Sequence, residues 1–158
     1  MKSRVSRLIL SMMAGCGLIA LGVSGLGSPV LANGVAEEAA SVNKPYTVEC
    51  ERNEEGRRVS CTVDQDTFVG WRTYGGNCAQ CHGQDGVGSS FAPNLIRSME
   101  NMTEEQFYAV LGNGQAGGQM PAFAENPNVW RHKERLYGYL RARANGELIG
   151  GRPARFDR

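Results

Sequence analysis

The sequence predicts a mainly α-helical domain preceded by a short β-hairpin. Between residues 65 and 146, three stretches combine polar helix-starting residues with apolar residues that recur on one helix face. Between residues 46 and 64, two runs rich in β-branched residues flank a polar turn that ends in glycine. A chain of 158 residues has room for one compact domain and several extensions.

The first 32 residues have the layout of a secretory signal peptide. Basic residues come first, an apolar stretch runs from Leu8 to about Leu26, and Val30 and Ala32 stand at the positions that determine cleavage. We therefore expect cleavage after Ala32 and export, with no stable membrane insertion afterwards. Two alternatives remain, an uncleaved membrane anchor, because the stretch is nearly long enough to span a bilayer, and a lipidated Cys16.

Cleavage would change the charge and the cysteine count of the mature chain. It removes three basic residues and no acidic ones, which lowers the formal net charge from +1 to −2. It also removes Cys16 and leaves four cysteines. In an exported chain we expect all four to be committed to disulfides or to a cofactor. The four are Cys50, Cys61, Cys78 and Cys81.

The predicted hairpin covers residues 46–64 and follows an expected flexible leader at residues 33–45. Cys50 and Cys61 lie on its two strands and would face each other. We expect them to form a disulfide, because an exported chain meets an oxidising compartment; two separate free thiols are the alternative. An isolated hairpin is marginally stable in water, so we also expect it to pack against the domain that follows.

The helical domain is expected to cover residues 65–146. Its first helix runs from about residue 66 to 74, with Asp66 or Thr67 as the cap and two glycines, at 75 and 76, as the stop. A loop is expected over residues 83–95.

A second helix should begin after Thr103, where the pattern T-E-E-Q forms a capping box, and end at Gly112. The last helix should cover about residues 128–144. Residues 147–158 are expected to be a C-terminal tail, either extended or disordered.

Cys78, Cys81 and His82 form the pattern C-x-x-C-H, which is the attachment signal for c-type haem. Each thiol would bond one vinyl group of the haem, and the histidine would ligate the iron. A structural zinc site would need a second pair of ligands, and no cysteine follows Cys81. A thioredoxin-like dithiol would need a preceding strand, whereas a helix is expected there. The sequence therefore predicts one covalent haem.

Met120 is the expected sixth ligand of the iron. It follows a glycine-dense stretch at residues 112–118, which lets the backbone pass close to a haem face. His132 is the alternative ligand, but it stands in a charged run that indicates a solvated helix face. Two other methionines, Met99 and Met102, are expected to fill gaps in the core.

With these motifs in order, residues 66–146 resemble a class I, mono-haem c-type cytochrome. The landmarks are the C-x-x-C-H pattern, F-A-P-N-L at residues 91–95 and Q-M-P-A-F at residues 119–123. The resemblance implies helices packed around one haem c. It also implies that the Pro93 carbonyl accepts a hydrogen bond from the His82 ring, which would fix the orientation of that ligand.

The same resemblance implies a close contact between the first and the last helix of the domain. Gly70 and Tyr74 match the small and aromatic positions of the first helix in such proteins. Leu136 and Tyr139 match their partners on the last helix. A glycine at position 70 would let the two backbones approach closely.

With one cysteine pair just ahead of the haem domain, the chain resembles the four-cysteine periplasmic cytochromes of methanol metabolism. This implies a single-electron shuttle rather than an enzyme. Its donor would be a PQQ-dependent (quinoprotein) methanol or alcohol dehydrogenase, and its acceptor a cytochrome or a terminal oxidase. The alternatives are a haem enzyme or gas sensor from which Met120 dissociates, and a cytochrome subunit of a larger dehydrogenase or oxidase complex. Nothing in the sequence indicates nucleic-acid binding.

Charge is unevenly distributed along the mature chain. Residues 131–158 carry a formal charge of +5, whereas residues 33–130 carry −7. Such patches steer encounters between electron carriers, although an ordinary solvated helix and tail would account for the basic end equally well.

Overall fold

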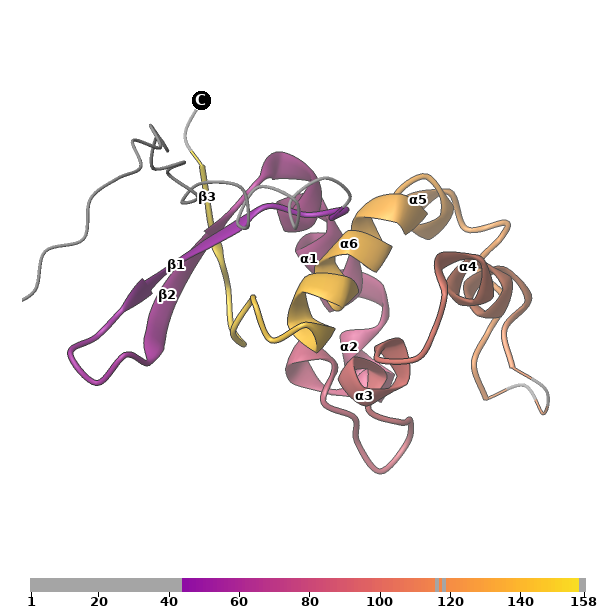
Figure 1. Cartoon of the computed structure of the whole chain (residues 1–158). Coiled ribbons are helices and arrows are strands. Elements are labelled where there is room, and N and C mark those ends of the chain that lie inside the picture. The colour runs from indigo at the N-terminus through magenta and orange to yellow at the C-terminus, as the bar shows by residue number, and fades with distance from the viewer. Residues whose placement is uncertain (1–43, 116, 118, 157–158) are drawn as a thin grey trace, which may run out of the picture. The chain divides into compact units, whose positions relative to one another are not determined.

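Helix α1 (Gln65–Asn77) packs against helix α6 (Lys133–Ala144) at the centre of the computed structural model, which describes residues 44–115, 117 and 119–156 (Figure 1). The expected signal peptide and nearly all of the expected leader lie outside these residues. None of the described helices is both long and apolar enough to cross a bilayer. The other elements are β1 (Val48–Arg52), β2 (Arg58–Val63), α2 (Ala79–His82), η2 (Gln84–Gly86), α3 (Leu95–Met99), α4 (Glu104–Asn113), α5 (Pro127–Trp130) and β3 (Ala154–Arg155).

Gly70 is the point of closest approach between α1 and α6. A Cβ atom at this position would lie 2.0 Å from the carbonyl oxygen of Arg135 and 2.9 Å from the Cβ of Tyr139. The ring centroids of Tyr74 and Tyr139 are 5.5 Å apart, and the side chain of Leu136 is buried beside them. The expected contact between the first and the last helix is confirmed.

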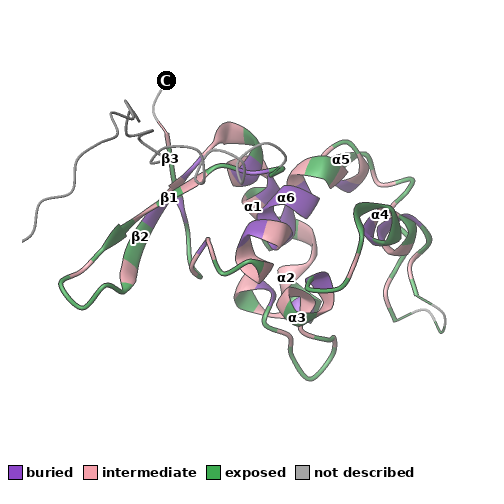
Figure 2. Cartoon of the chain, viewed as in Figure 1, coloured by how far each residue is buried: buried purple, intermediate pink, exposed green. Residues whose placement is uncertain are grey.

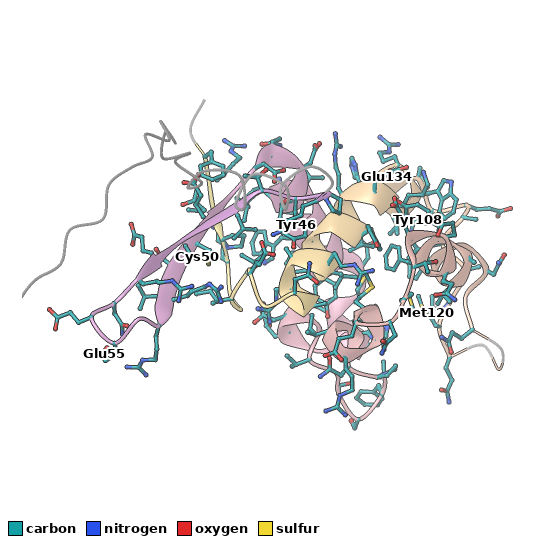
Figure 3. The ribbon with its side chains drawn as sticks, viewed as in Figure 1. Tyr46, Cys50, Glu55, Tyr108, Met120 and Glu134 are labelled. Atoms are coloured by element: carbon teal, nitrogen blue, oxygen red, sulfur yellow. A yellow bond between two sulfur atoms is a disulfide. The ribbon has the colours of Figure 1, made fainter. Side chains whose placement is uncertain are left out.

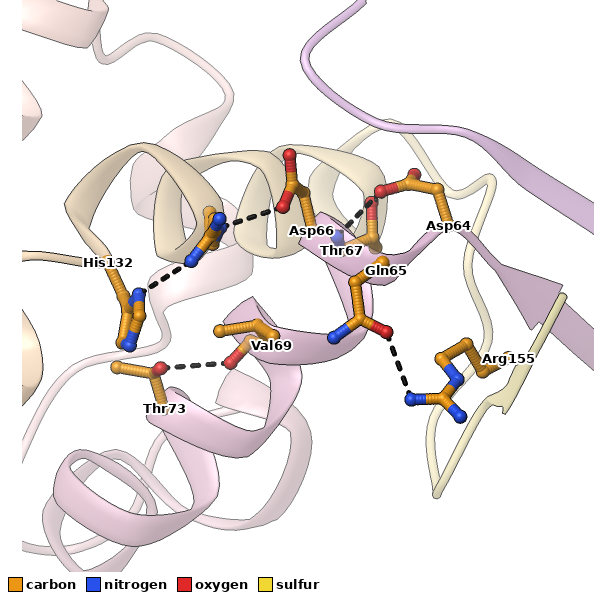
Figure 4. Close-up of polar contacts among 9 residues, drawn as sticks. Asp64, Gln65, Asp66, Thr67, Val69, Thr73, His132 and Arg155 are labelled. Atoms are coloured by element: carbon orange, nitrogen blue, oxygen red, sulfur yellow. Dashed lines mark hydrogen bonds and ion pairs between the residues drawn. The ribbon is translucent and has the colours of Figure 1, made fainter. Parts of the chain in front are cut away.

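Asp64 caps α1, and not Asp66 or Thr67 as expected. Its carboxylate accepts hydrogen bonds from the backbone N–H of Thr67 at 2.9 Å and from the Thr67 hydroxyl at 2.7 Å (Figure 4). Partial burial alone would raise the pKa of Asp64, but the hydrogen bonds from Thr67 and Thr47 outweigh burial and lower it. The expected stop at residues 75 and 76 is also wrong, because α1 continues through both glycines to Asn77.

The other helices confirm part of the expectation. Thr103 and Gln106 form the predicted capping box of α4, which ends at Asn113, one residue later than expected, with Gly114 as its C-cap. The expected single helix at residues 128–144 is wrong, because it is divided into α5 and α6 at His132, whose backbone is not helical. The expected loop at residues 83–95 contains the short helix η2, and α3 begins at its end, capped by Asn94.

The hairpin and its disulfide are confirmed. Strands β1 and β2 are antiparallel, and Cys50 lies directly opposite Cys61, to which it is bonded. The C-terminal tail is extended, which was one of the two expected alternatives. Its strand β3 pairs in parallel with β2 and completes a sheet with the order β1-β2-β3.

The hairpin packs on the C-terminal end of α6, as expected. The Tyr46 hydroxyl accepts a hydrogen bond from Asn145 at 2.6 Å and donates one to Glu147 at 3.0 Å. The Arg58 guanidinium donates to the carbonyl oxygen of Gly146 at 2.6 Å. Much of the hairpin is nevertheless exposed, whereas the contact between α1 and α6 is buried (Figure 2).

We expect Gly70→Ala to lower the free energy of unfolding by about 1–3 kcal/mol, because the new methyl group overlaps backbone atoms of α6. Gly75→Ala is the matched control, since a Cβ there meets no atom within 4 Å in the same helix. That variant should gain roughly 0.5–1 kcal/mol from helix propensity. Urea unfolding monitored by circular dichroism measures both, and equal effects of the two substitutions would contradict the close contact.

Replacing Cys50 and Cys61 together by serine should lower the free energy of unfolding by about 2–4 kcal/mol, because the unfolded chain loses a crosslink between residues 11 positions apart. The double variant avoids leaving one thiol free for wrong pairing. Thermal unfolding before and after the substitution measures the loss, and an unchanged midpoint would show that the crosslink does not stabilise the fold.

Candidate functional site

The C-x-x-C-H motif forms a single helical turn at the end of α1. Cys78 is at once the C-cap of α1 and the N-cap of α2. Its carbonyl oxygen accepts hydrogen bonds from the backbone N–H groups of Cys81 at 3.1 Å and His82 at 2.9 Å. Residues three and four positions apart on a helix share a face. Cys78 therefore shares a face of this turn with both Cys81 and His82. Among the described residues, neither thiol is bonded to the other or to another cysteine.

The surroundings of Cys78 suit a neutral sulfur. Burial, together with a smaller effect of the neighbouring Cys81, raises the pKa of its thiol to about 11. A thiolate is therefore disfavoured at this position, whereas a thioether carries no charge and suffers no such penalty. Cys81, in contrast, is exposed. These surroundings fit a haem attached through thioether bonds.

His82 is oriented by Pro93, as the resemblance implied. The ring is buried, and its Nδ1 lies 2.9 Å from the Pro93 carbonyl oxygen. A carbonyl oxygen can only accept, so in the neutral ring Nδ1 carries the proton and Nε2 has the lone pair. This tautomer leaves Nε2 of His82 available to bind a metal.

A tight loop at residues 83–88 brings Pro93 back to His82. The backbone N–H of Gly88 donates to the His82 carbonyl oxygen at 2.8 Å, and the Tyr74 hydroxyl donates to the Gly83 carbonyl oxygen at 2.6 Å. Gly83 has a φ of +75°, and a Cβ there would lie 2.4 Å from the Gly88 carbonyl oxygen. Only glycine fits such a crossing.

Met120 lies in a different segment, the loop that follows α4 (Figure 3). Its carbonyl oxygen accepts a hydrogen bond from the N–H of Gln115 at 3.1 Å. The loop returns to α4 where the N–H of Phe123 donates to the Leu111 carbonyl oxygen at 3.0 Å. Met120 is half-buried and packs against the core. The two cysteines, His82 and Pro93 therefore lie close together. Met120 lies in a separate loop, whose position is set by its hydrogen bonds to α4.

His132, the alternative ligand, is bound into the contact between α1 and α6. Its Nδ1 lies 3.0 Å from a guanidinium nitrogen of Arg135, whose Nε donates to Asp66 at 2.8 Å (Figure 4). Partial burial and then the charges of Arg135 and Arg131 lower the pKa of His132. The side chain is half-buried, so the expected solvated face is wrong at this residue.

The other two methionines behave as core residues. Met99 is 1% exposed, and Met102 packs against the same core. Arg141 of α6 holds this region, because its guanidinium donates to the carbonyl oxygens of both residues, at 2.7 Å for Met102. The sequence patterns did not indicate Arg141, which entered the sequence analysis only as one of the basic residues of the segment 131–158.

Comparisons with known proteins were made for the whole chain. A family model described as cytochrome c oxidase, cbb3-type, subunit III matches residues 66–140. Cytochrome c-553I of Paracoccus denitrificans is 42% identical over 99 residues, which are 59% of this chain and 44% of that protein. Cytochrome c-555 of Methylococcus capsulatus is 37% identical over 93 residues, which are 58% of this chain and 74% of that protein.

A solved structure with the same fold is that of the c-type cytochrome XoxG from Methylobacterium extorquens AM1. The two chains superpose with a TM-score of 0.58 and share 35% sequence identity. The similarity covers 73% of this chain and 76% of XoxG. It therefore extends beyond the helices that the family model matches.

Proposed function

Because the chain belongs to the c-type cytochromes, which carry electrons on covalently bound haem c, we propose that Cys78 and Cys81 attach one haem and that His82 ligates its iron. The observation that carries this proposal is the hydrogen bond between His82 Nδ1 and the Pro93 carbonyl oxygen. It leaves Nε2 as the ligand nitrogen. The bound haem supplies the one-electron chemistry.

The chain's own residues perform the remaining tasks in this proposal. The α1–α2 junction holds the two sulfurs and the imidazole on one helical turn. Pro93 keeps the His82 ring in one tautomer and one orientation, which limits the rearrangement that accompanies a change of redox state. The buried His82 and the half-buried Cys78 limit the access of water to this side of the site.

We propose Met120 as the sixth ligand. The loop that carries it is held at both ends by hydrogen bonds within its own segment and to α4. Gly114 has a φ of +71°, and a Cβ there would lie 2.5 Å from the Met120 carbonyl oxygen, so the loop folds back tightly beside this methionine. A thioether ligand favours ferrous iron and raises the reduction potential. An iron with two protein ligands has no open position for a substrate, which favours a carrier over an enzyme or a gas sensor.

We further propose that the protein works in the periplasm, where it accepts electrons from a quinoprotein methanol or alcohol dehydrogenase and passes them to a cytochrome or a terminal oxidase. The support is the disulfide of Cys50 and Cys61 in a hairpin directly ahead of the haem domain, the arrangement that resembles cytochromes of methanol metabolism. Docking would be brief, as is usual for redox partners.

A second candidate function is that of a cytochrome subunit in a larger oxidase complex. The matching family model, described as a subunit of cbb3-type cytochrome c oxidase, favours it. Co-purification distinguishes the two functions. A free carrier leaves the cells with the periplasmic fraction as a single chain, whereas a subunit stays with its complex after mild detergent extraction.

Met120→Ala should remove the methionine–iron charge-transfer band of the ferric protein and allow the ferrous protein to bind carbon monoxide, because one axial position becomes open. The reduction potential should fall by on the order of 0.1 V, within the roughly 0.8 V that axial ligands span. His132→Ala is the control and should change neither spectrum nor potential. The opposite pattern in the two variants would make His132 the ligand.

Stopped-flow mixing tests the proposed donor. A PQQ-dependent methanol dehydrogenase supplied with methanol should reduce the ferric protein with a second-order rate constant of about 10⁵–10⁷ M⁻¹ s⁻¹, as is typical of specific protein encounters. The mixture without methanol is the control. Failure of this reaction, with normal reduction by dithionite, would exclude this donor while leaving the electron-carrier function intact.

A further inference from the structure

Asp85 has an unusual backbone conformation directly beside the proposed haem ligand. It lies in η2, three residues after His82, with φ +62° and ψ +11°. Among the described residues it is the only one other than glycine with a positive φ. The left-handed conformation is unfavourable for residues with a side chain, and less so for aspartate than for most of them. Such a residue persists when surrounding contacts hold it, often near a functional site.

The contacts that hold Asp85 come from the C-terminal part of the chain. Its carboxylate accepts a hydrogen bond from the backbone N–H of Gly151 at 3.0 Å. Its carbonyl oxygen lies 3.4 Å from both Nε and Nη2 of Arg143, which donate to it. The same guanidinium donates through Nη1 to the Leu148 carbonyl oxygen at 2.8 Å. Asp85 and Arg143 therefore bind the tail from two directions.

The tail passes so close to Asp85 that a side chain at position 150 would push the Asp85 carboxylate aside. A Cβ on Gly150 would lie 2.8 Å from the second carboxylate oxygen of Asp85. On either side of this point the tail is anchored. Leu148 is 2% exposed and bonded to the end of α6, while Ala154 and Arg155 pair with β2 of the hairpin.

The loop on the other side of Asp85 is bonded directly to the proposed ligand. The N–H of Gly88 donates to the His82 carbonyl oxygen at 2.8 Å, so residues 83–88 close a ring of backbone onto His82. A continuous chain of contacts thus runs from the disulfide-linked hairpin through the tail and Asp85 to this loop.

We propose that Asp85 is a positioning residue that latches the C-terminal tail onto loop 83–88 and thereby holds the backbone of His82. The proposal rests on the proposed function only for the role of His82 as an iron ligand. It gives the hairpin and the tail a task in the haem site, although neither carries a ligand of the iron.

Three substitutions at position 85 separate the hydrogen bond from charge and from backbone strain. Asp85→Asn removes the charge but keeps an oxygen that can accept from Gly151, and asparagine tolerates a positive φ. Asp85→Gly relieves the backbone strain and removes the latch. Asp85→Ala removes the latch and keeps the strain.

The first measurement is hydrogen exchange of the Gly88 amide in the haem-loaded protein, followed by NMR. Exchange should become at least about tenfold faster in the Gly and Ala variants and stay within about threefold in the Asn variant, because local opening no longer has to break the latch. The hyperfine-shifted ring signals of His82 in the ferric protein should move in Asp85→Gly and Asp85→Ala. In Asp85→Asn they should stay at their wild-type positions.

Gly150→Ala tests the same contact from the tail without changing the loop, because its methyl group would displace the Asp85 carboxylate. It should accelerate Gly88 exchange like Asp85→Gly, whereas Gly76→Ala, where a Cβ meets nothing within 4 Å, should not. Unchanged exchange at Gly88 in Asp85→Gly and Gly150→Ala would overturn the latch, and so would an Asn variant that behaves like Gly. The Gly88 exchange readout requires neither Met120 as a ligand nor a redox partner, so a wrong partner or sixth ligand would leave that result intact.

Discussion

The packing of α1 against α6 at Gly70 is the constraint on which the rest of the structure depends. Because no side chain separates Gly70 from the backbone of Arg135, the two helices approach closely enough to bury Tyr74 and Tyr139 together. The position of α1 in turn decides where Cys78 lies, since this residue ends α1 and begins α2. A contact between residues 65 positions apart thus places the haem-attachment motif.

The site combines this rigid support with local hydrogen bonds that prepare each group for its task. The Tyr74 hydroxyl, which belongs to the same helix contact, donates to the Gly83 carbonyl oxygen and so holds the loop after His82. That loop returns the chain to Pro93, whose carbonyl oxygen orients the imidazole. Cys78 lies where a thiolate is disfavoured and a thioether is not. Such well-held surroundings suit an electron carrier, because a site that rearranges little between redox states exchanges electrons readily.

The hairpin and the tail support each other and the C-terminal end of α6. The hairpin is crosslinked by Cys50 and Cys61, pairs with β3 and bonds to the end of α6 through Tyr46. The tail also contacts Asp85, whose carboxylate accepts a hydrogen bond from Gly151. Short strands gain little stability alone. Their arrangement against α6 therefore explains how a domain with few long elements keeps its C-terminal segment ordered.

The sequence by itself determined the features that short-range chemistry controls. The capping box at Thr103 and the cysteine pair of the hairpin depend on residues a few positions apart, or on a turn between two strands, and each predicted its structure correctly. The C-x-x-C-H spacing indicated haem c, the cofactor of the family to which the chain belongs. The resemblance to a family added Pro93 and the Gly70 contact, which no local pattern reveals. Met120 stays a prediction, because its role depends on a haem.

Only the tertiary structure decided the features that depend on distant partners. The Asp64 carboxylate, which caps α1, also reaches Thr47 just ahead of β1, and α1 runs through two glycines that local propensity marks as a stop. The division of the last helix, in contrast, has a local cause, because Asn126 and Pro127 begin the separate helix α5. The strand of the tail and the conformation of Asp85 exist through contacts with β2, Gly151 and Arg143. Short-range patterns cannot encode them, because their hydrogen-bond partners are dozens of residues away.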